Sequence, residues 1–259
     1  MSGDRFQNPD VAEQALPEFA RESPSLWTRF RTAEDGPLLL LREVAISVGI
    51  VLVIGLLLFG TSGVWPPMVA VESESMEPNI GQYDLIFVTE PGRFAPDAAD
   101  RNGVVTADSV DGGGGDGHRS FDNPGSVVVY DNPASQGSPI IHRAHFYVEE
   151  GENWYDRANP EYVEADSCAE LESCPAEHSG YITKGDNQNS NGQYDQANGI
   201  APVVRPEWIT GIAQLRLPYV GYIRLALTGA ASFGPLVPAG LGAIGAGGAV
   251  AIGRRELLR

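Results

Sequence analysis

The chain has 259 residues, 42% of them hydrophobic, and a formal net charge of −17. So acidic a chain argues against nucleic-acid binding, because such sites need cationic side chains facing phosphates. The hydrophobic content argues for a folded core rather than a disordered acidic tail. Lys184 is the single lysine, and all other cationic side chains are arginine. This composition is typical of adaptation to high salt, where counter-ions screen the repulsion between like charges. It predicts that the protein comes from a halophile, and an archaeon in particular.

The first two predicted segments are a polar stretch and a membrane anchor. Residues 1–43 are polar and mixed in charge, whereas residues 44–64 carry no charge. A transmembrane helix needs roughly 20 mainly apolar residues, and the second segment meets that length. A cleaved signal peptide does not have so long a polar stretch ahead of its apolar segment, so we expect an uncleaved anchor. Arg29, Arg31 and Arg42 precede the anchor, and the positive-inside rule then places residues 1–43 in the cytoplasm.

Residues 65–222 form the predicted extracytoplasmic domain, and their pattern is that of a mainly β fold. Short β-branched or aromatic runs are bounded by Gly, Pro, Asn and Asp, as expected of strands joined by turns. The predicted strands are 84–88, 126–130, 140–148 and 180–183. Residues 95–122 interrupt this pattern with consecutive glycines and scattered aspartates, which indicates a flexible insertion or a surface loop.

Cys168 and Cys174 lie close together in an acidic loop of this domain. A disulfide is plausible if the loop lies outside the membrane, and two unpaired thiols are equally compatible with the sequence. Two cysteines without a nearby histidine pair lack the ligand set of a structural zinc site. We therefore expect no metal, and nothing in the sequence calls for an organic cofactor.

The end of the chain carries a second apolar stretch. Residues 223–253 are rich in Gly and Ala and include Pro235 and Pro238. Small residues and prolines are tolerated in membrane helices, so we predict a second transmembrane helix here. The arginine-containing tail 254–259 would then be cytoplasmic, in agreement with the first anchor. A Gly-rich tail lying at the membrane interface is the alternative.

A candidate nucleophile follows the first anchor, in the run Ser73-Glu74-Ser75-Met76-Glu77-Pro78. A serine hydroxyl is a weak nucleophile at its own pKa and needs an adjacent base. His142 and His145 lie on the predicted strand 140–148, and their spacing of three places them on opposite faces. Only one of the two can therefore face the nucleophile.

The other candidate groups lie around a Gly-Asp-Asn turn after the strand 180–183. Asp186 belongs to this turn and Asp195 comes later, and a turn of this kind can aim a carboxylate back at the sheet. The local sequence is equally compatible with a turn that has only a structural role. Lys184 is the one alternative base, but we expect the neighbouring Asp186 to raise its pKa, which favours histidine as the base.

Together these motifs resemble type I signal peptidases, specifically the archaeal and endoplasmic-reticulum branch. The resemblance covers about residues 45–215, and residues 1–43 have no clear counterpart. It rests on four motifs in family order: Ser73-x-Ser75-Met76-x-Pro78, Gly125-Ser-Val-Val-Val-Tyr130, Ile140-Ile141-His142-Arg143, and Lys184-Gly185-Asp186-Asn187 with the later Asp195.

The resemblance implies roles for five residues. Ser75 would be the nucleophile, and His142, which stands where the bacterial branch has a lysine, the general base. One of Asp186 and Asp195 would orient the histidine, and Asp195 is favoured. The hydroxyl of Ser73 and the backbone N–H of Ser75 would form an oxyanion hole. The chain departs from the family pattern between the two aspartates, where Asn189-Ser190-Asn191-Gly192 are extra residues.

The resemblance also implies a fold and a function. The fold would be a compact, partly open β-barrel-like catalytic domain with an N-terminal and a C-terminal transmembrane helix. The function would be a membrane-bound serine endopeptidase that cleaves N-terminal signal peptides from secreted preproteins in contact with the lipid bilayer and the protein translocation machinery. Two alternatives stay open: a non-catalytic membrane-anchored homologue acting as an assembly or binding subunit, and a serine hydrolase that cuts its own linker.

Overall fold

The computed structural model of the protein describes residues 25–108, 117–133 and 137–228. The chain divides into two compact units, Met1–Gly55 and Leu56–Arg259. The first holds α1 (Leu26–Arg31) and most of α2 (Gly36–Ser62). The second holds every described strand and the last helix, α4 (Gly221–Thr228).

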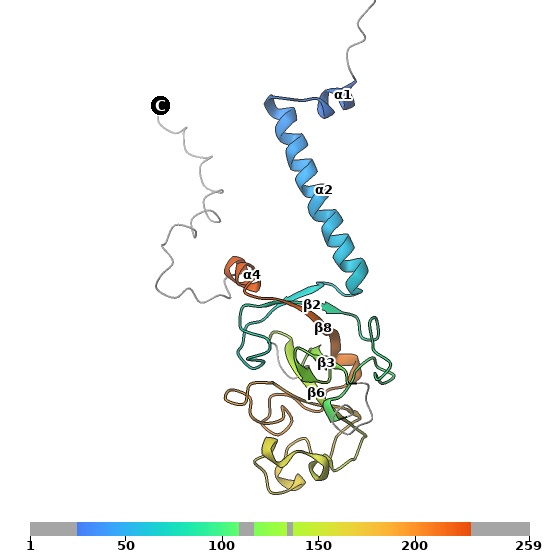
Figure 1. Ribbon diagram of the computed structural model, residues 1–259, viewed down its shortest axis with the longest axis vertical. Helices are drawn as coiled ribbons and strands as arrows, with labels where there is room; N and C mark the ends of the chain where they lie inside the picture. Colours follow the sequence, from blue (N-terminus) through green and yellow to red (C-terminus); the bar gives the residue numbers. More distant parts are fainter. Residues whose placement is uncertain (1–24, 109–116, 134–136, 229–259) are drawn as a thin grey trace, which may run out of the picture. The chain divides into compact units, whose positions relative to one another are not determined.

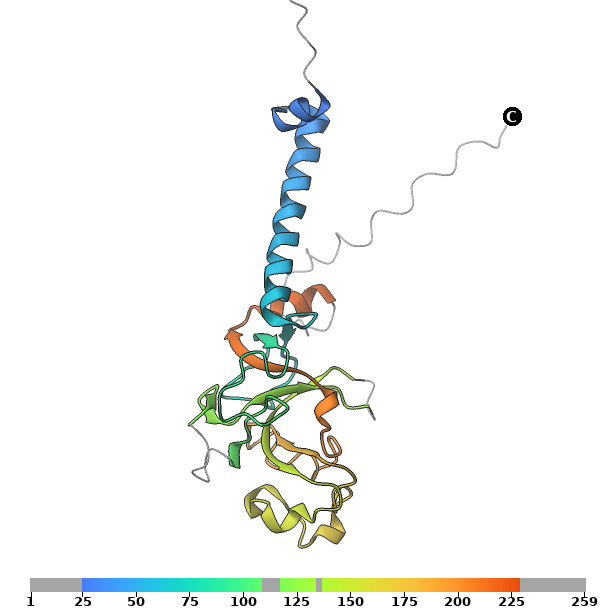
Figure 2. The same cartoon turned by 90° about the vertical axis from the view of Figure 1, so that its right-hand side faces the viewer.

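Helix α2 contains the predicted anchor and is an unbroken helix of 27 residues (Figure 2). At 1.5 Å per residue it is about 40 Å long, which exceeds a hydrocarbon core of about 30 Å. In the described part of the chain, it is the one helix long and apolar enough to cross a membrane. The helix begins at Gly36 rather than Val44, because Pro37 suits the first turn and a run of leucines continues the helix up to Arg42.

The second predicted membrane helix, 223–253, falls largely outside the described residues. Only its beginning is seen, as the end of α4. Residues 229–253 and the predicted cytoplasmic tail 254–259 are not among the residues that the structure describes.

Six strands form one antiparallel sheet in the order β1-β2-β8-β5-β6-β7. Their bounds are Met68–Ala70 (β1), Leu85–Thr89 (β2), Val127–Tyr130 (β5), Ile140–Val148 (β6), Gly180–Lys184 (β7) and Ile209–Leu217 (β8). The prediction of a mainly β domain is confirmed, and its four predicted strands are β2, β5, β6 and β7. β1 and β7 are the two edges, so the sheet does not close into a barrel. The last strand, β8, lies between β2 and β5 (Figure 1).

Strand β5 separates two parts of the core. Its residues are all buried, and alternate side chains point to opposite faces, as the pleat of a strand requires. Val127 and Val129 pack with Met76 in one cluster, whereas Val128 and Tyr130 belong to another. The loop that carries Ser75 is thus tied to the sheet by a fully buried neighbour.

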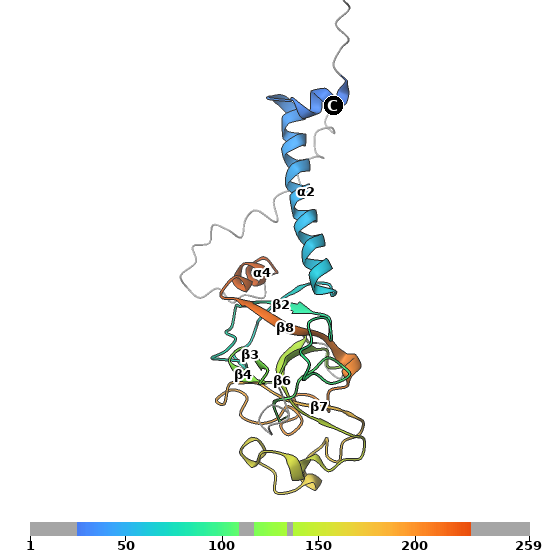
Figure 3. The same ribbon diagram turned by 45° about the vertical axis from the view of Figure 1, so that its right-hand side comes forward.

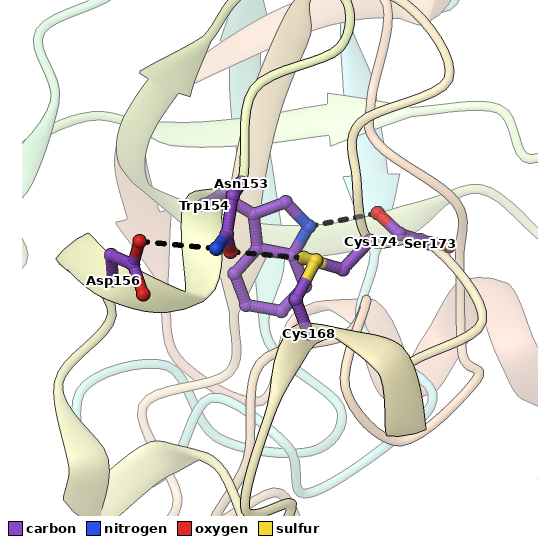
Figure 4. The surroundings of a disulfide bond; sticks show 6 residues. All are labelled: Asn153, Trp154, Asp156, Cys168, Ser173 and Cys174. Carbon is purple, nitrogen blue, oxygen red and sulfur yellow. Dashed lines mark hydrogen bonds between the residues drawn. A yellow bond between two sulfur atoms is a disulfide. The ribbon is translucent and has the colours of Figure 1, made fainter.

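A small lobe lies between β6 and β7. It contains three 3₁₀ turns, η1 (Trp154–Arg157), η2 (Pro160–Tyr162) and η3 (Cys168–Glu170), and a disulfide joins Cys168 to Cys174. Of the two possibilities left open by the sequence, the bonded pair is the one observed. Trp154 is fully buried beside it, and its indole N–H donates to the carbonyl of Ser173 (Figure 4). A fourth turn, η4 (Pro206–Trp208), leads directly into β8.

The predicted insertion 95–122 is packed in part. Val104 and Val105 are buried, and Ser126 exchanges two hydrogen bonds with Val105. Of the two possibilities expected for residues 95–122, a surface loop is the one that these contacts of Val104 and Val105 favour for this part. The short hairpin of β3 (Arg119–Ser120) and β4 (Asn123–Pro124) follows (Figure 3). Residues 109–116 lie outside the described ranges.

Candidate active site

Ser75 lies in the turn after β1, and contacts on both sides hold its backbone in place. The adjacent Met76 side chain is fully buried in the core. On the other side, the backbone N–H of Asn187 donates to the Ser75 carbonyl at 2.9 Å, and the Asn187 amide donates to the Glu74 carbonyl at 2.9 Å. The turn after β7 thus fixes the turn that carries the serine.

His142, on β6, makes hydrogen bonds through both ring nitrogens. Nδ1 lies 2.7 Å from Oδ2 of Asp195, and Nε2 lies 2.9 Å from Oγ of Ser75. An ionised carboxylate only accepts hydrogen bonds, so Nδ1 carries the proton in the neutral ring. Nε2 is then an acceptor, and the Ser75 hydroxyl donates to it. The three side chains form a hydrogen-bonded chain with the geometry that a nucleophile, a base and an orienting group require.

Asp195 is fully buried, and its carboxylate is surrounded by donors. Besides His142, the Tyr130 hydroxyl donates to Oδ2 at 3.0 Å and the Thr183 hydroxyl donates to the same oxygen at 2.6 Å. The amide of Asn191 donates to Oδ1 at 3.2 Å. Burial alone would raise the pKa of Asp195, but His142 and the hydrogen-bond donors outweigh it and hold the pKa below the usual value. The Asp195 carboxylate is therefore ionised at the pH values at which a histidine side chain is neutral.

Asp186 lies elsewhere, in contact with Arg143 instead of His142. The Arg143 guanidinium donates to both Asp186 oxygens, at 2.8 and 2.6 Å, and both side chains are buried. Burial would raise the pKa of Asp186, and the bonds from Arg143 and Asn79 bring it below the usual value. Arg143 also donates to the carbonyls of Ser120 and Gly125. In place of the orienting role considered from the sequence, Asp186 anchors an arginine that holds the β3–β4 hairpin.

His145 and Lys184 do not contact Ser75. The His145 ring packs against Tyr162 and Tyr194, and burial, followed by the nearby Lys184 charge, lowers its pKa to about 4. Lys184 is buried, and its ammonium donates to the Gly185 carbonyl at 2.8 Å. Burial lowers the pKa of Lys184 more than Asp186 raises it, so the expected direction of that shift is wrong. Of the three candidate bases, His142 is the one hydrogen-bonded to Ser75.

A groove with a volume of about 860 Å³ opens beside the serine, and both Ser73 and Ser75 line it. The Ser73 hydroxyl is 3.1 Å from the Ser75 hydroxyl. The walls are mainly apolar and come from β1 and from the start of β6. Their apolar residues include Val64, Pro66, Val69, Ala70, Val71, Val88, Val129, Pro139, Ile140 and Ile141. Such a groove suits an extended, apolar peptide segment.

Three of the residues that hold the His142–Asp195 pair have no role assigned to them by the sequence motifs. Tyr130, Thr183 and Asn191 all donate to Asp195. The sheet register could have indicated Tyr130 and Thr183, because Val128 pairs with His142 and Thr183 pairs with Ala144. Strand alternation then places Tyr130, His142 and Thr183 on one face of the sheet, but only once the strand pairing is known.

The described residues contain no cluster of three or more His, Cys, Asp or Glu side chains that could hold a metal ion. Comparison with models of known protein families finds no match. No curated protein matches the chain either.

Proposed function

We propose that the chain is a membrane-bound serine endopeptidase that removes N-terminal signal peptides from secreted preproteins. The observation that carries this proposal is the hydrogen-bonded series Ser75–His142–Asp195 at the edge of an apolar groove. The proposal also draws on the motif resemblance and on an apolar helix, α2, that is long enough to span a membrane.

The first half of the reaction forms an acyl-enzyme. As Ser75 Oγ attacks the carbonyl carbon of the scissile peptide bond, its proton passes to Nε2 of His142. Asp195 stabilises the imidazolium that results. When the tetrahedral intermediate collapses, the C–N bond breaks and His142 gives the proton to the leaving amine.

The second half hydrolyses the acyl-enzyme. Water loses a proton to Nε2 of His142 and attacks the ester carbonyl, and collapse of this second intermediate returns the proton to Ser75. In both intermediates the negative oxygen would accept hydrogen bonds from the Ser73 hydroxyl and the Ser75 backbone N–H. Donors aimed at the developing charge stabilise the transition state more than the substrate.

The membrane accounts for how such an enzyme selects its substrate. We propose that residues 1–43 are cytoplasmic and that the catalytic domain lies on the extracytoplasmic side. A preprotein delivered by the translocation machinery is held in the same bilayer by its own apolar segment. This raises the effective concentration of its cleavage site without extended sequence recognition. β1 is an edge strand next to Ser75, so an extended substrate has a strand to pair with.

The test is cleavage of a radiolabelled preprotein, in molar salt, by membranes that contain the chain. The wild type and Ser75→Ala are compared at equal protein level, with Ser190→Ala, an exposed serine, as the matched control. We expect the mature product with the wild type and Ser190→Ala and none with Ser75→Ala. Equal cleavage by all three would assign the activity to another enzyme and leave the chain as an assembly or binding subunit. An internal cut in the purified wild-type chain, read from its intact mass, would indicate self-processing instead.

A further inference from the structure

Asn191 is a buried polar residue within a segment that has no place in the motif resemblance. It belongs to the extra residues Asn189–Gly192, and its preceding neighbours Asn189 and Ser190 are exposed. The Asn191 side chain is instead only 2% exposed. A buried amide needs hydrogen-bond partners, and the partners of Asn191 are the groups of the candidate active site.

The Asn191 amide nitrogen contacts both members of the His142–Asp195 pair. It donates to Oδ1 of Asp195 at 3.2 Å and lies 3.5 Å from Nε2 of His142. The bonds from Tyr130, Thr183 and His142 all converge on Oδ2. Among the hydrogen bonds of the described residues, the Asn191 bond is the one made to Oδ1. The other three bonds all meet at Oδ2 and would let the carboxylate turn about that atom. The Asn191 bond to Oδ1 therefore fixes its rotation.

The orientation of the amide is set by its surroundings. Its oxygen accepts a hydrogen bond from the Asn198 amide at 3.2 Å. A flipped amide would place this oxygen against Oδ1 of Asp195, where two acceptors would meet. Gly185 provides the space, because a Cβ at that position would lie 2.6 Å from the Asn191 amide nitrogen.

The same turn reaches the nucleophile. The backbone N–H of Asn191 donates to the Asn187 carbonyl at 2.8 Å, and the Asn187 N–H donates to the Ser75 carbonyl at 2.9 Å. One continuous path therefore runs from the backbone of Ser75 to the carboxylate of Asp195. A shift of the turn moves the nucleophile and the orienting group together.

We propose that Asn191 is a positioning residue, which locks the Asp195 carboxylate so that His142 presents Nε2 to Ser75. The inference rests on the proposed function, since it describes how that site is held ready. The hydrogen bond of its amide is to the orienting carboxylate, Oδ1 of Asp195. Asn191 acts through Asp195 and His142, and it is the residue by which the extra segment reaches the site, whereas the preceding Ser190 is exposed.

Loss of the Asn191 amide has two expected effects. The Asp195 carboxylate gains rotational freedom, which lowers the fraction of enzyme with His142 aligned on Ser75. The carboxylate also loses a donor, so its negative charge is less neutralised and the hydrogen bond that it accepts from Nδ1–H of His142 changes. The other charged side chains nearby, Arg143 on β6 and Lys184 on β7, are unchanged by the substitution. The Nδ1–H resonance of His142, which reports this hydrogen bond, is therefore expected to shift.

The experiment compares wild type, Asn191→Leu and Ser190→Ala as full-length protein in detergent and molar salt. Asn191→Leu keeps the approximate volume and removes the amide, and Ser190→Ala controls for changes in the same turn. We expect Asn191→Leu to lower kcat about 10- to 100-fold, the effect of one lost hydrogen bond to a charged group, with KM unchanged. NMR of ¹⁵N-histidine-labelled protein, assigned with His142→Gln, should show the Nδ1–H resonance of His142 shifted from its wild-type position.

Unchanged values of kcat and of the His142 Nδ1–H resonance in Asn191→Leu would overturn the inference. The signals of His145 and His178 report whether the fold persists, and Asn191→Ala is judged by the same criteria if the leucine variant does not fold. The two proposals can fail separately. A shifted His142 resonance in Asn191→Leu, in a chain whose wild type cleaves no preprotein, refutes the peptidase and retains the positioning role. Cleavage by the wild type, with no shift of this resonance in Asn191→Leu, overturns the positioning role and retains the peptidase.

Discussion

Asp195→Asn replaces the carboxylate that holds His142 with an amide of the same size. Asp195 accepts four hydrogen bonds, three of them at Oδ2. An amide accepts at its oxygen only, so its NH₂ group must face some of these donors. If the NH₂ group faces Nδ1, the ring proton moves to Nε2, and His142 can no longer accept the Ser75 proton. The same exchange in a Ser-His-Asp triad lowers kcat about 10⁴-fold, which is about 5.5 kcal/mol of activation free energy.

Asp186→Asn is the matched change at the second carboxylate, and its expected effect is on stability. The exchange leaves Arg143 buried without its charged partner, since the two side chains are only 3% and 4% exposed. Breaking a buried ion pair in this way costs about 3–5 kcal/mol. For a domain of this size each kcal/mol lowers Tm by about 2–4 °C, so a fall of roughly 6–20 °C is expected. Below its Tm, the folded variant should keep most of its kcat.

The assay measures kcat on a preprotein and Tm by circular dichroism for both variants in molar salt. Asp195→Asn should lose activity even at temperatures where it is fully folded, whereas Asp186→Asn should lower Tm and keep most of its kcat below that Tm. The reasoning is refuted if Asp186→Asn loses activity as Asp195→Asn does while Tm stays at the wild-type value. Near-wild-type kcat in Asp195→Asn would equally refute the orienting role drawn from the 2.7 Å contact.

Two further predictions concern Ser73 and His145. Ser73→Ala removes one donor from the proposed oxyanion hole and should lower kcat about 100- to 1000-fold with KM unchanged, and full activity would rule that role out. The folded-state pKa of His145 is about 4, against about 6.5 when unfolded, so between these values the unfolded chain binds a proton that the folded chain does not. The contribution of His145 to folding stability should therefore fall by roughly 2.5 kcal/mol as pH drops from 6.5 to 4. Guanidinium unfolding at several pH values should show a smaller fall in His145→Phe, and an equal fall in both proteins would contradict the assignment.

The strands that can be predicted from the sequence are those with dense β-branched side chains. β5 and β6 are examples, with Val127–Tyr130 and Ile140–Val148. β1 is not evident in the sequence, because it has three residues and directly follows an apolar helix and two prolines. β8 is hidden because Gly211, Ala213 and Gln214 dilute its pattern, although the strand is central. Pairing with β2 on one side and β5 on the other, and not local propensity, makes that segment a strand.

The residues of the candidate site also differ in whether the local sequence or only long-range contacts identify them. Ser75 and His142 stand in short motifs, so local sequence is enough to indicate both of them. The choice between Asp186 and Asp195 depends on contacts across 53 residues, because Asp195 meets His142 only through strand pairing. So acidic a chain offers many carboxylates, and sequence spacing cannot rank them. Asn191 belongs to a segment outside the motif pattern, and only its burial reveals its contacts.

Because β8 lies inside the sheet, its position determines when the sheet can be completed during synthesis. β8 is the last strand in the described part of the chain, yet it joins β2 on one side to β5 on the other. In a chain that emerges N-terminus first, the strand pairing that joins β1–β2 to β5–β6–β7 cannot form until β8 (Ile209–Leu217) is present. Ser75 follows β1, and His142 belongs to β6. The sheet that carries His142 and adjoins the Ser75 turn is thus continuous only once β8 has been made.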